Sequence, residues 1–266
     1  AADNLSPVER KKKLEKLEAN VIEWILFFFS EFAKYPFTKF HKKAIKRITT
    51  NMEWYEVLSW SRELAKSTIV FMCMMYLVLT GKKKNVLLIS NSHENAVRLL
   101  EPYKKAFESN SMLKAYYGDL REFGSWTADE FTLTTGATFR AIGALESPRG
   151  TRKDAVRPDT ALVDDFDTDE GCRNPDTIDK NWTWWEKALY GTRDTAVKTL
   201  IVFCGNIIAR DCCVVRAGHM ADHWDVVNIR DEKGYSTWPS KNTEESIDIA
   251  LSKISTAAQQ TEYFNN

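Results

Sequence analysis

The sequence has no excess of charge of either sign. Its 266 residues include 37 Lys and Arg and 37 Asp and Glu, so the net charge is zero. A protein that binds nucleic acid through its overall field is strongly basic. A DNA-binding role for this chain would therefore require a local basic patch. The residues 11–13 are all lysine, but a solvated helix face explains this run more simply.

Long hydrophobic runs and paired cysteines are also missing. The apolar stretches 25–29 and 69–79 are too short to span a bilayer, and the charged first twenty residues do not resemble a signal peptide. The five cysteines are odd in number and lack the spacing of a zinc site. We therefore expect a soluble intracellular protein with reduced thiols and no membrane partner.

The chain does contain strand patterns that alternate with helix patterns. Predicted strands cover 53–58, 85–90, 160–165, 198–203 and 223–229, and predicted helices cover 7–34, 38–49, 69–79, 93–109 and 175–190. A hairpin is expected from 130 to 142, on either side of Gly136. The alternation predicts an α/β fold with a mainly parallel central sheet flanked by helices. We divide the chain into a helical N-terminal segment (1–50), a core (51–217) and a small C-terminal subdomain (218–266).

The segment from Trp60 to Thr68 lies between a predicted strand and a predicted helix, which is the context of a phosphate-binding loop. In such a loop the backbone amides and the helix dipole attract phosphates. Lys66 would contact the β and γ phosphates, and Ser67 would ligate Mg²⁺. Trp60 and Ala65 occupy the two positions where glycine is usual. Taken alone, the segment fits equally well a helix that simply begins with Lys-Ser-Thr.

Asp164 and Asp165 end a hydrophobic strand at the sheet edge where α/β proteins bind ligands. In a phosphate-loop ATPase the first acid holds Mg²⁺ and the second polarises the attacking water. The acidic run 164–170 could instead be a solvated loop, but its combination with a Lys-Ser loop favours an ATPase. A two-metal nuclease centre would need three converging carboxylates and would leave Lys66 and Ser67 without a role.

Two further segments carry candidate site residues. Gly205 and Asn206 follow the strand 198–203, so the Asn206 amide would lie near the γ-phosphate, although an ordinary turn is the simpler interpretation. Arg149 and Arg152 precede the acid-ending strand, and their guanidinium groups could pair with phosphates of ATP or DNA. Surface arginines of a loop are the alternative for that pair.

Together these motifs resemble the ATPase half of the large terminase subunit of tailed bacteriophages, over most of residues 35–266. The resemblance includes an arginine early in the phosphate loop, here Arg62. The other matching segments are Pro36 to His41, Ser147 to Arg152, Arg157 to Asp159, Gly205 with Asn206, Trp238 with Pro239, and Thr261 to Asn266. By this resemblance the fold is a P-loop NTPase of the ASCE or RecA-like class, and a nuclease domain would follow the segment given.

The resemblance also implies roles for individual residues. Asp165 would be the catalytic acid, Arg62 an arginine acting within its own subunit, and Arg149 or Arg152 a finger offered to a neighbour. Ser67 and Asp164 would hold Mg²⁺. The residues expected to bind ATP are Ser61, Arg62, Glu63, Leu64, Ala65, Lys66, Ser67, Thr68 and Asn206.

The implied activity is ATP hydrolysis that drives double-stranded viral DNA into a procapsid. The implied partners are DNA, the portal protein, the small terminase subunit and further copies of the chain, as a pentamer on the portal. The implied location is the cytoplasm of the infected bacterial host. Two alternatives stay open, a helicase-like DNA translocase and an inactive nucleotide-binding scaffold of a ring.

Overall fold

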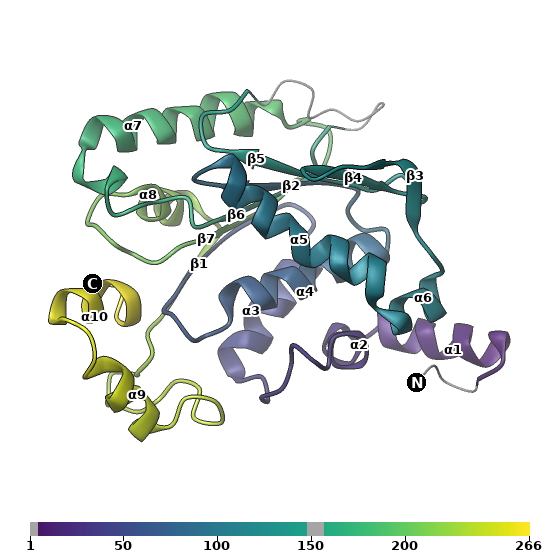
Figure 1. Ribbon diagram of the computed structural model, residues 1–266, viewed down its shortest axis with the longest axis horizontal. Helices are drawn as coiled ribbons and strands as arrows, with labels where there is room; N and C mark the ends of the chain where they lie inside the picture. The colour runs from purple at the N-terminus through teal and green to yellow at the C-terminus, as the bar shows by residue number, and fades with distance from the viewer. Residues whose placement is uncertain (1–4, 148–156) are drawn as a thin grey trace.

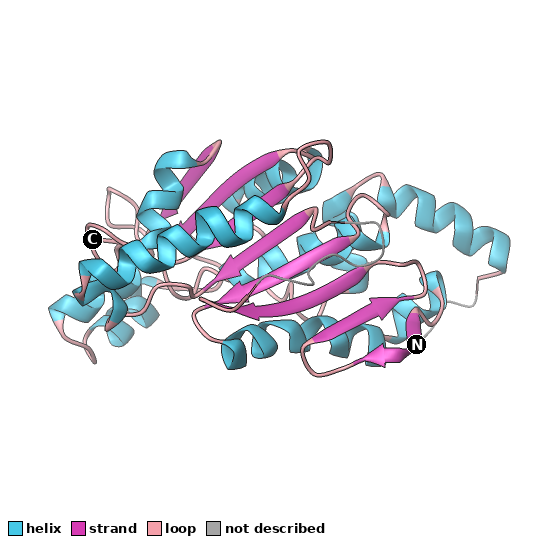
Figure 2. Cartoon of the chain, turned by 90° about the horizontal axis from the view of Figure 1, so that it is seen from above, coloured by secondary structure: helices cyan, strands magenta, loops and turns pink. Residues whose placement is uncertain are grey.

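The structure is a computed structural model that describes residues 5–147 and 157–266, so Arg149 and Arg152 lie outside the described residues. Eight strands of the described residues form one sheet in the order β3-β4-β5-β2-β6-β7-β1-β8 (Figure 1). These strands are β1 (Trp54–Trp60), β2 (Asn85–Ser90), β3 (Arg121–Trp126), β4 (Glu130–Leu133), β5 (Thr138–Gly143), β6 (Thr160–Asp164), β7 (Leu200–Cys204) and β8 (His223–Val227). Only β4 runs against the others, at the edge where the hairpin was expected (Figure 2). The predicted α/β fold with a mainly parallel sheet is therefore confirmed.

Helices cover both faces of the sheet. The α-helices are α1 (Pro7–Glu18), α2 (Val21–Phe28), α3 (Lys39–Thr50), α4 (Lys66–Leu79), α5 (His93–Ser109), α6 (Ser111–Tyr117), α7 (Pro175–Thr183), α8 (Cys213–Met220), α9 (Glu244–Leu251) and α10 (Thr256–Tyr263). In Figure 1, α3, α4 and α5 lie below the sheet, and α7 and α8 lie above it. None of the helices in the described residues is long and apolar enough to cross a membrane.

Alternate residues of the central strands supply two separate cores. Val86 and Leu88 of β2 join the core with α2 to α5, whereas Leu87 and Ile89 join the core with α7 and α8. Successive strand side chains point to opposite faces, so a continuous apolar run is what a sheet covered on both sides requires. Helix α4 lies almost wholly inside the first core, which explains why its sequence is apolar on all sides.

The first predicted helix, 7–34, is wrong as a single element. Its start is as expected, because Ser6 and Glu9 form a capping box. The helix stops at Glu18, however, and Asn20 begins a second one by accepting hydrogen bonds from the amides of Ile22 and Glu23. Asparagine competes for backbone donors more effectively than it extends a helix. Two other expectations were incomplete. Strand β3 was not foreseen. The helix that begins at 175 continues as a π-helix at Trp184–Leu189 and as a 3-10 turn at Tyr190–Thr192.

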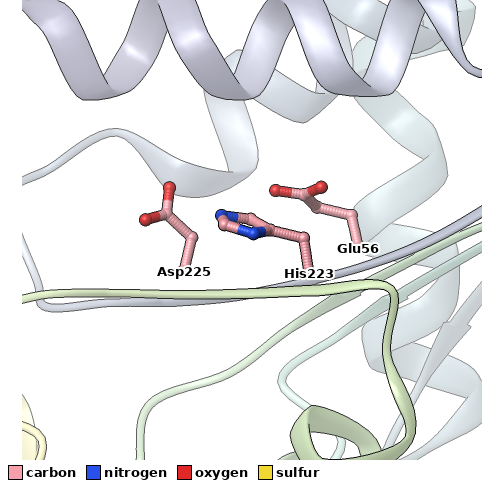
Figure 3. A group of neighbouring side chains, drawn as sticks. All are labelled: Glu56, His223 and Asp225. Carbon is pink, nitrogen blue, oxygen red and sulfur yellow. The ribbon is translucent and has the colours of Figure 1, made fainter.

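A partly buried group of ion pairs ties α3 to β1 and β8. Arg47 donates to the Glu56 carboxylate (Nη2–Oε1 2.6 Å) and to Asp225 (Nη2–Oδ2 2.9 Å). Glu56, His223 and Asp225 offer ligand atoms within 4.8 Å of one another, which is close enough for a metal ion (Figure 3). Arg47 already supplies the positive charge between the two carboxylates, and a metal would have to displace it. We therefore assign this group to stability, because an unpaired buried carboxylate would be costly.

Candidate functional site

The loop between β1 and α4 contains two residues with left-handed backbone. Ala65, the residue before α4, has a left-handed conformation with φ 60° and ψ 29°, and Glu63 has φ 70°. Left-handed positions of this kind are usually glycine. No side chain caps the start of α4 within the described residues, so the amides of its first turn keep their donors for a ligand.

Trp60 takes the place of the first glycine without obstructing the loop. Its ring is fully buried and packs against Phe40 (centroids 4.9 Å apart) and His41 (5.4 Å). The indole Nε1 donates to Asp225 Oδ2 at 3.2 Å. The side chain is thus directed into the core beneath α3, while the Trp60 carbonyl accepts a hydrogen bond from Lys66.

Lys66 is held from two sides. Its Nζ donates to Asn206 Oδ1 at 2.9 Å and to the Trp60 carbonyl at 3.4 Å. Asn206 follows β7, the strand between β1 and β6 in the sheet. The structure therefore brings the predicted phosphate-binding lysine and the predicted amide together at one sheet edge.

Ser67 and Asp164 form the group predicted to hold Mg²⁺. The Ser67 hydroxyl donates to Asp164 Oδ2 at 2.5 Å. Burial raises the pKa of Asp164 above its usual range; the Lys66 ammonium opposes this shift, and the charge of Asp165 adds to it. A buried carboxylate beside a hydroxyl is an oxygen donor set that suits Mg²⁺, and a bound cation would offset the burial of the negative charge.

Asp165 is exposed, in contrast to Asp164, and it borders the same open space at the sheet edge as Lys66 and Ser67. Its φ of 48° turns the chain sharply after β6. Asn91 Nδ2 donates to the Asp165 carbonyl at 2.7 Å and fixes this turn from the end of β2. The backbone is thus anchored while the carboxylate remains accessible to water.

A cleft of about 810 Å³ lies along this edge of the sheet. Of the residues predicted to bind nucleotide, all but Leu64 line it; Leu64 is fully buried, and its carbonyl is 3.0 Å from His41 Nε2. Sequence reasoning did not point to five further polar residues that line the cleft, namely Ser90, Asn91, Asn95, Arg98 and Glu262. Ser90 ends β2 and Asn91 follows it, so the rule that ligands bind at the carboxyl ends of strands could have found these two.

The acidic run after β6 is not simply a solvated loop. Asp167 accepts hydrogen bonds from the amides of Cys213 and Val214, both at 2.8 Å, and so caps the start of α8. Burial raises the pKa of Asp167, and these amide hydrogen bonds act against that shift. Some acids of this run therefore line the cleft, and Asp167 stabilises the start of a helix.

The C-terminal residues close one side of the cleft. Glu262 forms an ion pair with Arg62, and its carbonyl accepts from the Arg62 amide at 2.9 Å and from Asn206 Nδ2 at 3.1 Å. Asn265 donates to the Ser59 carbonyl at 3.0 Å and accepts from the Ile207 amide at 3.1 Å. The predicted arginine of the loop is therefore engaged by Glu262 in this structure, and sequence reasoning had given Glu262 no role.

No protein-family model and no curated protein matches this sequence. Solved structures share its fold. The HK97 bacteriophage large terminase aligns over 87% of this chain and 50% of its own, with a TM-score of 0.58 and 14% identity. A mutant of the Thermus phage P74-26 large terminase ATPase domain aligns over 90% of this chain and 97% of its own, with a TM-score of 0.50 and 14% identity. The chain thus shares the fold of phage large terminase ATPase domains, as the resemblance predicted, and spans about half the length of the HK97 protein.

The strained conformation of Ala65 predicts that Ala65→Gly will stabilise the protein. Left-handed backbone costs a residue with a side chain about 1–2 kcal/mol, and the extra entropy of glycine in the unfolded chain offsets part of this gain. We expect a net increase of about 1 kcal/mol in the free energy of unfolding, measured by urea denaturation. Ala137→Gly is the control, since Ala137 does not have positive φ and the change should destabilise. A loss of stability for Ala65→Gly would contradict the proposed strain.

His41 predicts a second effect, on the pH dependence of stability. Burial lowers its pKa from the usual 6.5 to about 4, a hydrogen bond to the Leu64 carbonyl opposes the shift, and the Lys241 charge adds to it. The folded state therefore binds a proton less readily than the unfolded state. The contribution of neutral His41 to the free energy of unfolding is fully present above pH 6.5. It is lost as the pH falls toward 4, by roughly 3 kcal/mol in total.

His41→Gln should be less stable at neutral pH but should lose less stability between pH 6.5 and 4. Urea denaturation at a series of pH values measures this slope. His93→Gln, at an exposed position, controls for the loss of a histidine. An unchanged slope in His41→Gln would mean that other groups cause the acid sensitivity.

Proposed function

We propose that this chain is an ATP-hydrolysing motor domain that translocates double-stranded viral DNA during packaging. The observation that carries the proposal is the convergence of Lys66, Ser67, Asp164 and Asn206 on one cleft. The fold shared with phage large terminase ATPase domains supports it. The proposal thus joins a site geometry to a fold, and neither alone would specify a DNA motor.

The start of α4 would receive the nucleotide phosphates. Free amides in its first turn donate hydrogen bonds, and Lys66 adds a positive charge. Ser67 and Asp164 would hold Mg²⁺, which when bound neutralises charge on the phosphate oxygens. A phosphate beside Lys66 would compete with Asn206 Oδ1 for the ammonium group, so the Asn206 amide would respond to the nucleotide.

Asp165 would take the proton of the attacking water. It is exposed to the cleft, and its neighbour Asp164 is engaged by Ser67, so the two acids differ in environment as the two roles require. Arg62 would contact the phosphates of its own subunit after leaving Glu262. Arg149 or Arg152 would serve the site of an adjacent subunit.

The same residues suggest how hydrolysis could move DNA. Asn206 contacts Lys66 through its oxygen and the Glu262 carbonyl through its nitrogen. A change at Lys66 would therefore be transmitted to residues 261–265, which also contact β1 and β8. We propose that this movement of the C-terminal region shifts DNA held by a ring of subunits on a portal protein. The small terminase subunit is a further proposed partner, and the bacterial cytoplasm is the proposed location.

The ATPase assignment predicts a loss of nucleotide binding in Lys66→Ala. ATP with Mg²⁺ at 100 times its dissociation constant stabilises a protein by about 2.7 kcal/mol. Thermal melting should reveal this increase in the parent and in the control Lys84→Ala, an exposed lysine at the other end of the sheet. Lys66→Ala should show little or none of it. Equal stabilisation of Lys66→Ala and the parent would show that the loop assignment is wrong.

Asp165→Asn should retain ATP-dependent stabilisation but lose roughly 10²- to 10⁴-fold in phosphate release, because an amide cannot accept the proton of water. Glu170→Gln, another exposed acid of the same loop that does not line the cleft, should retain the parent rate. Phosphate release by the parent is measured with and without duplex DNA. A complete absence of turnover in both conditions would favour the inactive scaffold instead.

The Arg62–Glu262 ion pair predicts that Glu262→Gln binds ATP more tightly. The change releases Arg62 and removes a negative charge from the cleft, and exposed ion pairs are worth about 0.2–1 kcal/mol. A decrease of up to about fivefold in the dissociation constant is expected, measured with a fluorescent ATP analogue. Glu245→Gln on α9 is the matched control. Weaker binding by Glu262→Gln would contradict the competition and indicate that Glu262 supports the nucleotide site.

A further inference from the structure

We propose that four lysines on the outer face of α3 bind the phosphate backbone of duplex DNA. These residues, here called the α3 stripe, are Lys39, Lys42, Lys43 and Lys46. The inference deepens the proposed function and rests on it, because it assigns a DNA-contacting surface to the motor. It also supplies the local basic patch that a protein of zero net charge would need to bind DNA.

The stripe lies within an unusually basic part of the sequence. Residues 32–52 contain five lysines and one arginine and no Asp or Glu. The only arginine, Arg47, is directed inward and pairs with Glu56 and Asp225. The four lysines of the stripe are exposed, whereas Ala44, Ile45 and Ile48 on the opposite face are buried. The four lysine side chains of α3 thus lie together on its solvent-facing side.

Nothing in the described residues neutralises this charge. Within the described residues, no hydrogen bond or ion pair involves the side chain of a stripe lysine, whereas the exposed Arg98 and Arg121 are both paired with acids. Like charges three and four residues apart on a helix repel, and lysines in a first helical turn oppose the helix dipole. The arrangement is therefore unfavourable for the isolated helix, and an external polyanion would relieve it.

The dimensions of the stripe suit a nucleic-acid backbone. Lys39 and Lys46 are seven residues apart, which is about 10.5 Å along a helix axis. Duplex DNA carries a charge about every 1.7 Å, so the stripe spans roughly six phosphate charges. Lysines are flexible point charges that contact phosphates without reading bases. Contact independent of sequence is what a translocating motor needs.

The N-terminal lysines provide an internal comparison. Helix α1 also carries exposed lysines, but Glu9 and Glu15 lie among them. Lys13 of that helix stacks over the Phe27 ring at 4.3 Å from its centroid. Mixed charge and intramolecular contacts fit the solvated face expected from the sequence. We therefore place the DNA contact on α3 and use α1 as the control.

Helix α3 is also connected to the nucleotide cleft. His41, on its buried side, lies 3.0 Å from the Leu64 carbonyl of the phosphate loop. DNA bound to the stripe would thus be one residue contact away from the loop. We infer that the same surface transmits DNA binding to the loop, so that DNA stimulates phosphate release through α3.

The test compares two triple variants. The first is Lys42→Gln/Lys43→Gln/Lys46→Gln on α3, and the second is Lys11→Gln/Lys12→Gln/Lys16→Gln on α1. Glutamine and lysine have similar helix propensities, so both variants should keep the parent circular dichroism spectrum. Binding of a labelled DNA duplex is measured by fluorescence anisotropy between about 50 and 200 mM NaCl. Each phosphate contact contributes about 0.9 to the slope of log affinity against log salt.

We expect the α3 variant to lower that slope by roughly 2 to 3 and to lose DNA-stimulated phosphate release while keeping the DNA-free rate. The α1 variant should match the parent in both. An unchanged slope in the α3 variant, with normal binding by the parent, would overturn the stripe alone. A parent that binds no duplex would overturn both the stripe and the DNA-motor proposal. A changed slope without any phosphate release would leave the stripe standing and refute the ATPase.

Discussion

The in-register pairing of three parallel strands is the constraint on which the candidate site depends. Leu58 of β1 and Asp164 of β6 both pair with Cys204 of β7, so β6 and β7 end at the same level and β1 continues only to Trp60. The segments that follow them must then meet at one edge of the sheet. This is why the side chains of Ser67 and Asp164, 97 residues apart in the sequence, come within 2.5 Å of each other.

The two departures from glycine in the phosphate loop have different physical consequences. Trp60 is the last residue of β1, and its side chain follows Leu58 into the core below the sheet. The indole is therefore accommodated in the core, where it packs against its neighbours and donates a hydrogen bond to Asp225. Ala65 gains no comparable stabilising contact, and it has a left-handed backbone conformation that glycine would adopt more readily. A large substitution is thus better tolerated than a small one, because conformation rather than size decides the cost.

Sequence reasoning found the parts of the site that depend on local pattern. Buried strands such as β2 and β7, and the polar residues that follow them, were visible from apolar runs and turn residues. The contacts that it missed join distant segments or depend on competition for backbone donors. Arg62 and Glu262 are 200 residues apart, and no periodicity links them. Asn20 ends a helix pattern that its neighbours would continue. Strand β3 is mostly exposed and contains Gly124, so it lacks the alternation of a half-buried strand.

The loop between β1 and α4 is held largely through its backbone, and these backbone contacts determine which elements would respond to a change in the loop. The Val227 and Glu262 carbonyls accept the amides of Ser61 and Arg62, and His41 contacts the Leu64 carbonyl. Three separate elements, β8, α10 and α3, therefore fix one short loop. A ligand that draws Lys66 away from Asn206 would disturb this arrangement where the C-terminal segment is attached. Because α3 also presents the exposed lysines, the loop lies between a basic surface and the C-terminal segment. A small shift of its backbone would reach both without any rearrangement of the sheet.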